Sequence, residues 1–176
     1  MDVFSRTFLP AAAEAGVAIP TVSRHMPVLR RCVESDDPAV LVTRCLRPDR
    51  PLRGEFLLLL THRRLVVTQE TRVLHRLRLH LNAELRHLHN VSWSPDPRLS
   101  AVELAATAID GVRERFWIRT GHPKQVWHLD ALLSHVFRPR LHADRVAAAA
   151  RSLAARPVPA GTPVTTRREF VPALAT

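Results

Sequence analysis

The sequence has few of the residue types on which several kinds of functional site depend. Its five glycines are scattered along 176 residues, so there is no Gly-rich loop that could cradle a phosphate. Its two cysteines, Cys32 and Cys45, cannot build a disulfide framework, and we expect both thiols to be reduced and buried. No apolar run approaches the length of about 18 residues that a membrane-spanning helix needs. Asp2 stands where a signal peptide would carry positive charge, so we expect a cytoplasmic protein.

Catalytic motifs are missing as well. The sequence contains no G-x-S-x-G, H-E-x-x-H or EF-hand pattern, and its Ser, His and Asp residues are not spaced as a triad. Among ten histidines, His87 and His89 could share one side of a strand, with His75 and His80 nearby. Zinc needs three or four converging ligands, and neither cysteine lies near these histidines. We therefore predict no enzymatic activity, no cofactor and no metal site.

Positive charge is abundant, at +10 net, but only Lys124 among the 26 basic residues is a lysine. Such a preference for Arg resembles the codon bias of a GC-rich genome, which weakens the usual link between net charge and nucleic acid. Base stacking would also need aromatic side chains beside the basic ones. The sequence has no tyrosine, and Trp117 is the only aromatic residue that we expect on a basic strand face.

Residues 39–137 read as about seven short strands followed by one amphipathic helix. The alternation from Val73 to Leu81 predicts a strand with one apolar face and one wet face that carries Arg76, Arg78 and His80. Asp110-Gly111 separates two alternating runs, which is a strong hairpin signal. The remaining strands are expected at Ala39–Leu46, Gly54–Leu60, Leu65–Thr68, Leu88–Trp93, Val102–Ala108 and Arg115–Arg119.

The closing helix is expected to begin at Pro123 and to end at Arg138-Pro139, with an apolar stripe that includes Val126, Leu129 and Leu133. Such a stripe must cover the sheet. Trp127 adjoins it, and we expect this ring to seal the end of the fold.

The segments on either side of the strands and the closing helix divide into three further regions. Residues 1–36 form an N-terminal extension that is partly helical. Its first part holds at most a short helix, and a second helix within Val22–Ser35 begins near Met26 because of Pro27. Residues 140–156 are Ala-rich and are expected to form an accessory helix, and residues 157–176 form a Pro-rich, flexible tail.

The segment from Gly54 to Val67 resembles the G-x-hydrophobic run-T-x-x-R-hydrophobic signature of bacterial pleckstrin-homology-like (PH-like) and GRAM-like domains. Leu85, Leu88 and Val91 follow with a spacing similar to the family's entry into its fifth strand. The resemblance covers about residues 37–139. It implies a mainly β fold (α+β), a bent seven-stranded antiparallel barrel capped by a C-terminal helix, with helical extensions at both ends.

The resemblance also implies a candidate site. In lipid-binding members of the family, the loop after the first strand carries basic residues, and here Arg44, Arg47, Arg50 and Arg53 occupy it. Arg suits anion binding because its planar fork pairs with phosphate oxygens. The alternative interpretation is that a loop in an Arg-rich protein simply contains Arg, since the family's lysine-containing pattern is absent.

Three functions remain after these exclusions. We favour a noncatalytic adaptor that docks a protein partner, because a small curved sheet with an exposed edge can add a peptide strand. The first alternative is peripheral binding to anionic head groups at the inner face of the membrane, through the Arg-rich loop. The second is nonspecific nucleic-acid binding through net charge. Hydrophobic residues on an exposed strand edge would favour the adaptor.

Overall fold

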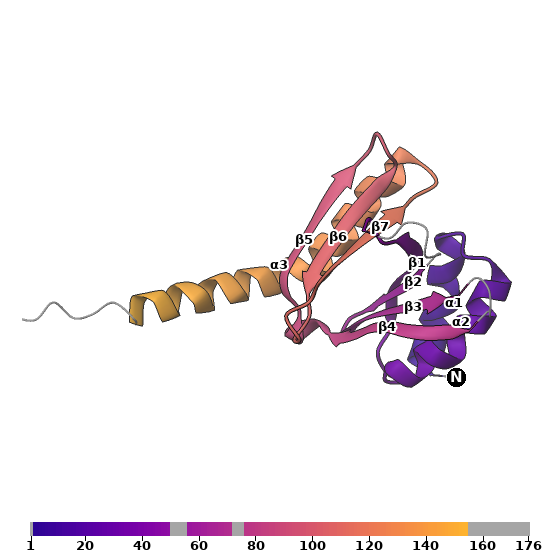
Figure 1. The fold of residues 1–176 in the computed structure, drawn as a ribbon, viewed down its shortest axis with the longest axis horizontal. Helices are drawn as coiled ribbons and strands as arrows, with labels where there is room; N and C mark the ends of the chain where they lie inside the picture. Colours follow the sequence, from indigo (N-terminus) through magenta and orange to yellow (C-terminus); the bar gives the residue numbers. More distant parts are fainter. Residues whose placement is uncertain (1, 50–55, 72–75, 155–176) are drawn as a thin grey trace, which may run out of the picture.

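The computed structural model describes residues 2–49, 56–71 and 76–154, and within them the strands form one antiparallel sheet (Figure 1). Neighbouring strands follow the order β4-β3-β2-β1-β7-β6-β5. The strands are β1 (Ala39–Leu46), β2 (Phe56–Thr61), β3 (Arg64–Glu70), β4 (Leu77–Glu84), β5 (His89–Asp96), β6 (Ala101–Thr107) and β7 (Arg113–Arg119). The helices are α1 (Val3–Glu14), α2 (Ile19–Cys32), the short 3₁₀ turn η2 (Leu85–His87) and α3 (Pro123–Ala154). The expected mainly β, α+β class with seven antiparallel strands is therefore confirmed.

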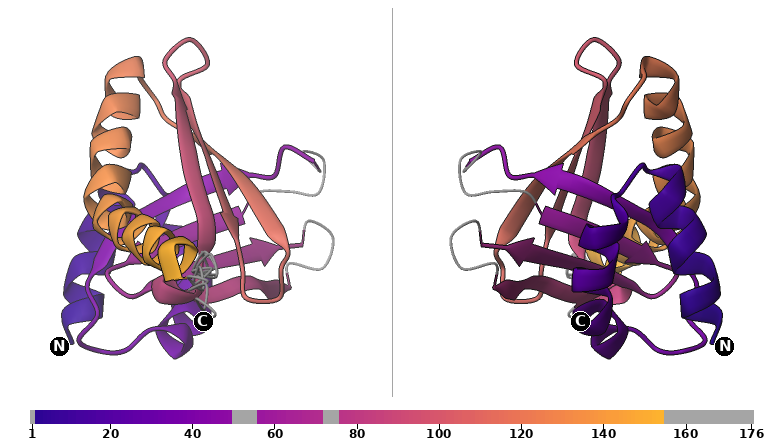
Figure 2. Two further views of the ribbon diagram at one scale, coloured as in Figure 1. Left: turned by 90° about the vertical axis from the view of Figure 1, so that its left-hand side faces the viewer. Right: turned by 90° about the vertical axis from the view of Figure 1, so that its right-hand side faces the viewer.

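The sheet is strongly bent, so that β5, β6 and β7 cross over the half made of β1 to β4 (Figure 2). β4 and β5 are its two edge strands and do not pair with each other. The molecule is thus an open bent sheet rather than a closed barrel in its hydrogen bonding. The first part of α3 packs against β5 and β6 on the inner side of the bend. There Val126, Leu129 and Leu133 join the inner core, as the apolar stripe predicts.

A second core lies on the outer face of β1, β2 and β3, beneath α1 and α2. Phe4, Phe8 and Leu29 pack there against Leu57 and Leu59. Because side chains alternate along a strand, Phe56, Leu58 and Leu60 of β2 enter the inner core, while Leu57 and Leu59 enter the outer one. All six residues of β2 are therefore buried, which explains why this strand is a continuous apolar run.

The N-terminal helices are longer than expected. α1 has 12 residues, and its first turn is capped by Asp2, whose carboxylate accepts a hydrogen bond from the Ser5 amide at 2.6 Å. α2 starts at Ile19, where Pro20 fits the first turn, and it continues through Pro27. The predicted start near Met26 is wrong, because burial of one face of α2 on the sheet offsets the hydrogen bond that Pro27 cannot make.

α3 also passes through a proline. The expected end at Arg138-Pro139 is wrong, since one helix of 32 residues runs from Pro123 to Ala154 and includes most of the separate accessory helix that we predicted. The Ala-rich sequence after Pro139 has a high helix propensity, which tolerates the loss of one hydrogen bond. Despite this length, none of the helices in the described residues is both long and apolar enough to span a bilayer.

The tryptophan that holds α3 is Trp93 rather than Trp127. Trp127 is 57% exposed, so the expectation that it seals the end of the fold is wrong. Trp93 of β5 instead lies with its ring centroid 6.0 Å from that of Phe137, and its Nε1 donates a hydrogen bond to Asp130 Oδ1 at 2.8 Å.

β4 differs from its predicted face pattern. Val67 pairs with Leu81 but Thr68 pairs with Leu79, so His80 is the extra residue of a bulge. His80 consequently points inward, with its ring 5.3 Å from that of Phe56, whereas Leu79 is 49% exposed. The placement of His80 on the wet face is wrong for this reason. The first part of the predicted strand, at Val73, lies outside the described residues.

Most other boundaries agree with the sequence. β1 has the predicted bounds, and the turn between β6 and β7 contains Asp110 and Gly111. Gly111 has a φ of +80°, and the Asp110 carboxylate accepts a hydrogen bond from the Val112 amide at 2.9 Å. The hairpin prediction is confirmed, because glycine accepts this left-handed backbone without strain.

Candidate functional site

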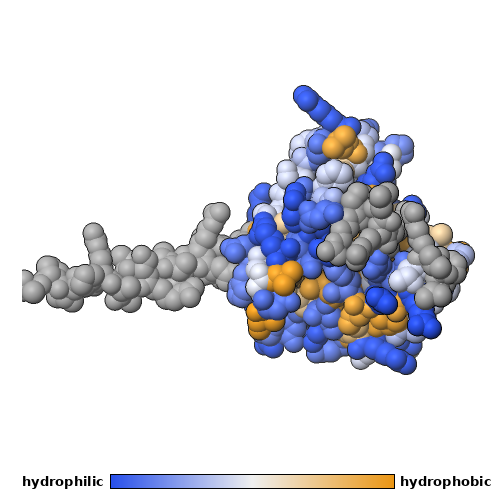
Figure 3. Space-filling view, viewed as in Figure 1, coloured by the Kyte–Doolittle hydropathy of each residue, from blue (hydrophilic) through white to orange (hydrophobic). Residues whose placement is uncertain are grey.

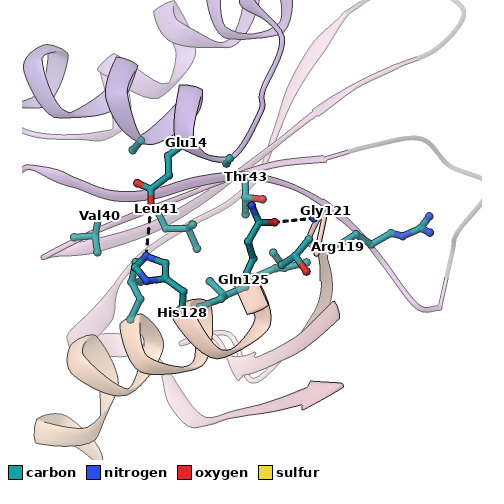
Figure 4. A pocket seen from close by; sticks show the side chains of 14 residues that line it. Glu14, Val40, Leu41, Thr43, Arg119, Gly121, Gln125 and His128 are labelled. Carbon is teal, nitrogen blue, oxygen red and sulfur yellow. Dashed lines mark hydrogen bonds and ion pairs between the residues drawn. The ribbon is translucent and has the colours of Figure 1, made fainter. Parts of the chain in front are cut away.

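A hollow opens where the end of α1, the edge of β1, the end of β7 and the first turns of α3 come together. Figure 4 shows its inner part, which has a volume of about 110 Å³. An outer part of about 520 Å³ adjoins it and shares Glu14, Thr43, Arg119 and Gln125 with it. We call the two together the α1–α3 groove.

The floor of this groove is a strand edge that is only partly paired. β1 pairs with β2 from Ala39 to Cys45 on one side. On the other side, the described residues pair with β7 only at Cys45 and Leu46. β7 ends at Arg119, and the chain turns away through Gly121 into α3. The Ala39 amide donates to Thr7 Oγ1 of α1 at 2.8 Å, and the edge of β1 from Val40 to Thr43 faces the groove without a neighbouring strand among the described residues.

The two walls of the groove are apolar near the strand. Ala11 and Ala15 of α1 stand on one side, and Leu129 and Leu132 of α3 stand on the other. α1 belongs to the outer layer and α3 to the inner layer of the fold. The free edge of β1 thus lies in a slot between the two helical layers.

The rim of the groove is polar and mostly basic. Arg44, Arg119 and His122 line its outer part, and Arg119 extends away from the inner hollow (Figure 4). Arg44 already interacts with a partner group. Glu14 of α1 reaches across to His128 of α3, with 3.5 Å between the carboxylate and Nε2. Both side chains are well exposed, so this ion pair is a weak bridge over the inner hollow.

Gln125 fixes the entry into α3. Its Oε1 accepts a hydrogen bond from the Gly121 amide at 2.8 Å, and both residues line the groove (Figure 4). This contact holds the turn that ends β7 opposite the free part of β1.

The predicted anion-binding residues do not form one cluster in the described part of the chain. Arg44 lies on β1 and lines the groove. Arg47 is paired with Glu114 of β7 at 3.0 Å, and its side chain is only 17% exposed. Arg50 and Arg53 lie outside the described residues. Anion binding through this loop stays a prediction, but Arg47 already has a carboxylate partner.

Arg47 belongs to a small polar cluster inside the bend of the sheet. Glu114 is buried, and its Oε2 lies 3.3 Å from Nε2 of His80, which is itself 3.2 Å from a guanidinium nitrogen of Arg47. His80 lies on β4 and Glu114 on β7, and Arg47 directly follows the end of β1. They tie the edge strand β4 to the other half of the sheet, which gives His80 a structural role.

The outer face of β7 is another basic strand face, which carries Arg115 and Arg119. Trp117 is exposed there, as predicted, and its Nε1 donates to Glu103 Oε2 at 2.9 Å. Arg115 binds the other oxygen of Glu103 at 2.7 Å. The hydrogen bond from Trp117 is the main cause that lowers the pKa of Glu103, and the hydrogen bond from Arg115 lowers this pKa further. The ring and the guanidinium are thus engaged by a carboxylate, which fits a solvated face better than a stacking platform.

Exposed apolar residues offer no rival site on the face shown in Figure 3. Hydrophobic residues form small patches there, separated by hydrophilic ones. Scattered exposed apolar side chains of this kind are ordinary on protein surfaces.

The described residues hold no group of three or more metal-ligating side chains. Cys45 is buried in the inner core, as expected, and burial raises the pKa of its thiol well above the usual range. Cys32 is only half-buried, so the expectation that both thiols are buried is wrong for this one; burial raises its pKa also. A protonated thiol is a poor nucleophile and a poor ligand.

Sequence reasoning missed the α1–α3 groove because the segments that line it come from distant parts of the chain. One signal was present: Gly121 and Pro123 stop the last strand early. In an antiparallel register that places Ile118 beside Cys45, such a stop leaves the first half of β1 uncovered.

Comparisons with known proteins do not identify the chain. No protein-family model matches the sequence, and no curated protein matches it significantly.

Proposed function

We propose that this chain is a noncatalytic adaptor, built on a PH-like domain, that docks a protein partner in the α1–α3 groove. The PH-like assignment is supported by the order of the strands, in which a four-stranded meander (β1 to β4) and a three-stranded one (β5 to β7) meet at β1 and β7. It is supported also by the strong bend and by the C-terminal helix that covers the inner side (Figure 2).

One observation carries the proposal: the free edge of β1 is flanked by apolar side chains. Unpaired strand edges in natural proteins are usually covered or blocked by charge, because they attract other strands. Here Leu41 on the strand and Leu132 on α3 face the space beside that edge. A half-covered edge in an apolar slot is a typical docking site for a protein segment.

A photo-crosslinking experiment tests this function. A photoreactive amino acid is placed at Gln125, which lines the groove, and in a second protein at Ala131, which is exposed on α3. Each tagged protein is irradiated in extract of its native cells at low and moderate salt after nuclease treatment. We expect a protein to be crosslinked from position 125 and not from position 131, and to remain at moderate salt.

The opposite result is equally clear. If no protein is crosslinked from position 125, or if both positions give the same products, the groove does not dock a partner. Material that follows membranes or nucleic acid and is lost as salt rises would replace the adaptor with electrostatic binding.

A further inference from the structure

We infer, given the proposed function, that the partner presents an extended segment that adds to the free edge of β1 as a strand and carries a carboxylate beside Arg119. The argument rests on the unpaired edge, on the two helices beside it and on the charge of the rim.

The edge of β1 determines the shape of the occupant. Backbone groups of a strand point alternately to its two sides, so the stretch from Val40 to Thr43 presents donors and acceptors to the groove. Buried backbone groups need partners. A helix or a rigid head group would leave these backbone groups without hydrogen-bond partners. An extended peptide can pair with them one after another, in the position that β7 would occupy if it continued past Arg119.

The flanking helices determine which side chains fit. An added strand would lie between α1 and α3, and its side chains would point alternately to each of them. One set would meet the small apolar side chains of Ala11 and Ala15, which line one wall of the inner hollow. The other would meet Leu129 and Leu132 over the inner hollow of about 110 Å³. That hollow suits one apolar anchor.

The rim determines the charge of the occupant. Arg119 and His122 line the outer part, and Arg119 is exposed. Glu14, the acidic residue of the same rim, faces His128. A carboxylate next to the apolar anchor would lie beside Arg119, where a guanidinium can form paired hydrogen bonds to it. The net charge of +10 adds a long-range attraction for an acidic segment.

The lining disfavours single-stranded nucleic acid. Among the residues that the structure describes, no Trp or Phe lines either part of the groove, and single strands are bound mainly through stacking on aromatic rings. The proposed occupant is an acidic segment of another protein, and association with a second copy of this chain is a separate outcome of the test.

The first experiment selects peptides. The full chain is immobilised and offered a displayed library of random dodecapeptides at moderate salt. We expect the enriched peptides to combine an apolar residue with Asp or Glu at a near position. Replacing that acidic residue by its amide should weaken binding about 5- to 10-fold. If no peptide is enriched, or if the enriched ones lack acidic residues, the inference is wrong.

Two variants locate the contact. Arg119→Glu should weaken the binding of the selected peptide by at least the same factor. Arg78→Glu, which makes the same change of charge on β4, should leave the affinity unchanged. Hydrogen exchange should show new protection in residues 40–43 when the peptide is bound. N-methylation of single backbone amides of the peptide should abolish binding at every second residue and have little effect at the residues between them. Equal loss in both variants, or no protection of β1, would overturn strand addition.

The outcome is separable from that of the proposed function. If the partner is still crosslinked in Arg119→Glu, with no change in the hydrogen exchange of β1 on binding, the adaptor role stands and the mode of binding proposed here fails. If position 125 crosslinks nothing, the adaptor role itself fails. Self-association that is lost in Arg119→Glu would identify the segment as part of a second copy.

Discussion

At the scale of single residues, His25 illustrates how burial and a polar partner act together. Its Nδ1 lies 2.7 Å from Thr68 Oγ1 between α2 and β3, and its side chain is buried. Burial lowers the pKa of His25 from its ordinary value of 6.5. The folded state therefore binds this proton less readily than the unfolded state, so His25 favours unfolding as the pH falls.

We predict that the protein loses stability as the pH drops through about 6.5 and below, because His25 must then be charged or exposed. The urea midpoint should fall between pH 7.5 and pH 5.5. In His25→Asn, which cannot titrate, the fall should be clearly smaller, whatever its absolute stability. His135→Asn, at an exposed position, is the control and should keep the wild-type fall. An unchanged pH response in His25→Asn would contradict this explanation.

At the scale of elements, α3 depends on Trp93. We predict that Trp93→Phe lowers the free energy of unfolding by about 1–2 kcal/mol, because it removes a partly buried hydrogen bond to Asp130 and some ring contact. Trp127→Phe should change it by less than about 0.5 kcal/mol, since this ring is exposed. Urea unfolding followed by circular dichroism measures both. The reverse ranking would restore Trp127 as the ring that holds the helix.

The sequence predicts strands better than helix ends here. Alternation and the Asp110-Gly111 turn are local signals, so β1 and the β6–β7 hairpin are found correctly. The helix ends at Pro27 and Pro139 are missed, because packing and neighbouring propensity outweigh the local rule.

The candidate site is less predictable. The bulge at His80 adds one residue to β4, so the side chains before it lie on the opposite faces from those that a regular alternation predicts. The α1–α3 groove depends on α1 packing on the outer face of β1, and nothing in the sequence of α1 specifies that neighbour. The apolar run of β2 was the available hint, because a strand buried on both faces needs a second layer.

At the scale of the whole molecule, the two cores share β2 and β3, so they should unfold together. Phe8→Ala in the outer core and Leu133→Ala in the inner core should each cost about 2–5 kcal/mol. All three tryptophans lie between residues 93 and 127, far along the chain from Phe8. We predict that Phe8→Ala nevertheless shifts the midpoint seen by tryptophan fluorescence as much as the one seen by circular dichroism.

The exposed neighbour Leu9 provides the control for this experiment. Leu9→Ala should change the free energy of unfolding by less than about 0.5 kcal/mol, because this side chain is 47% exposed. Two separate transitions in Phe8→Ala would mean that the N-terminal helices and the sheet are independent units.

The length of α3 has a consequence for assembly. Its 32 residues span about 48 Å at 1.5 Å per residue, and the later turns extend beyond the sheet (Figure 1). Gln125, in the groove, and Ala154, at the end of α3, are therefore held on the order of 45 Å apart. The helix acts as a spacer, so a segment bound in the groove and anything joined after Ala154 would be kept at a fixed reach without steric conflict.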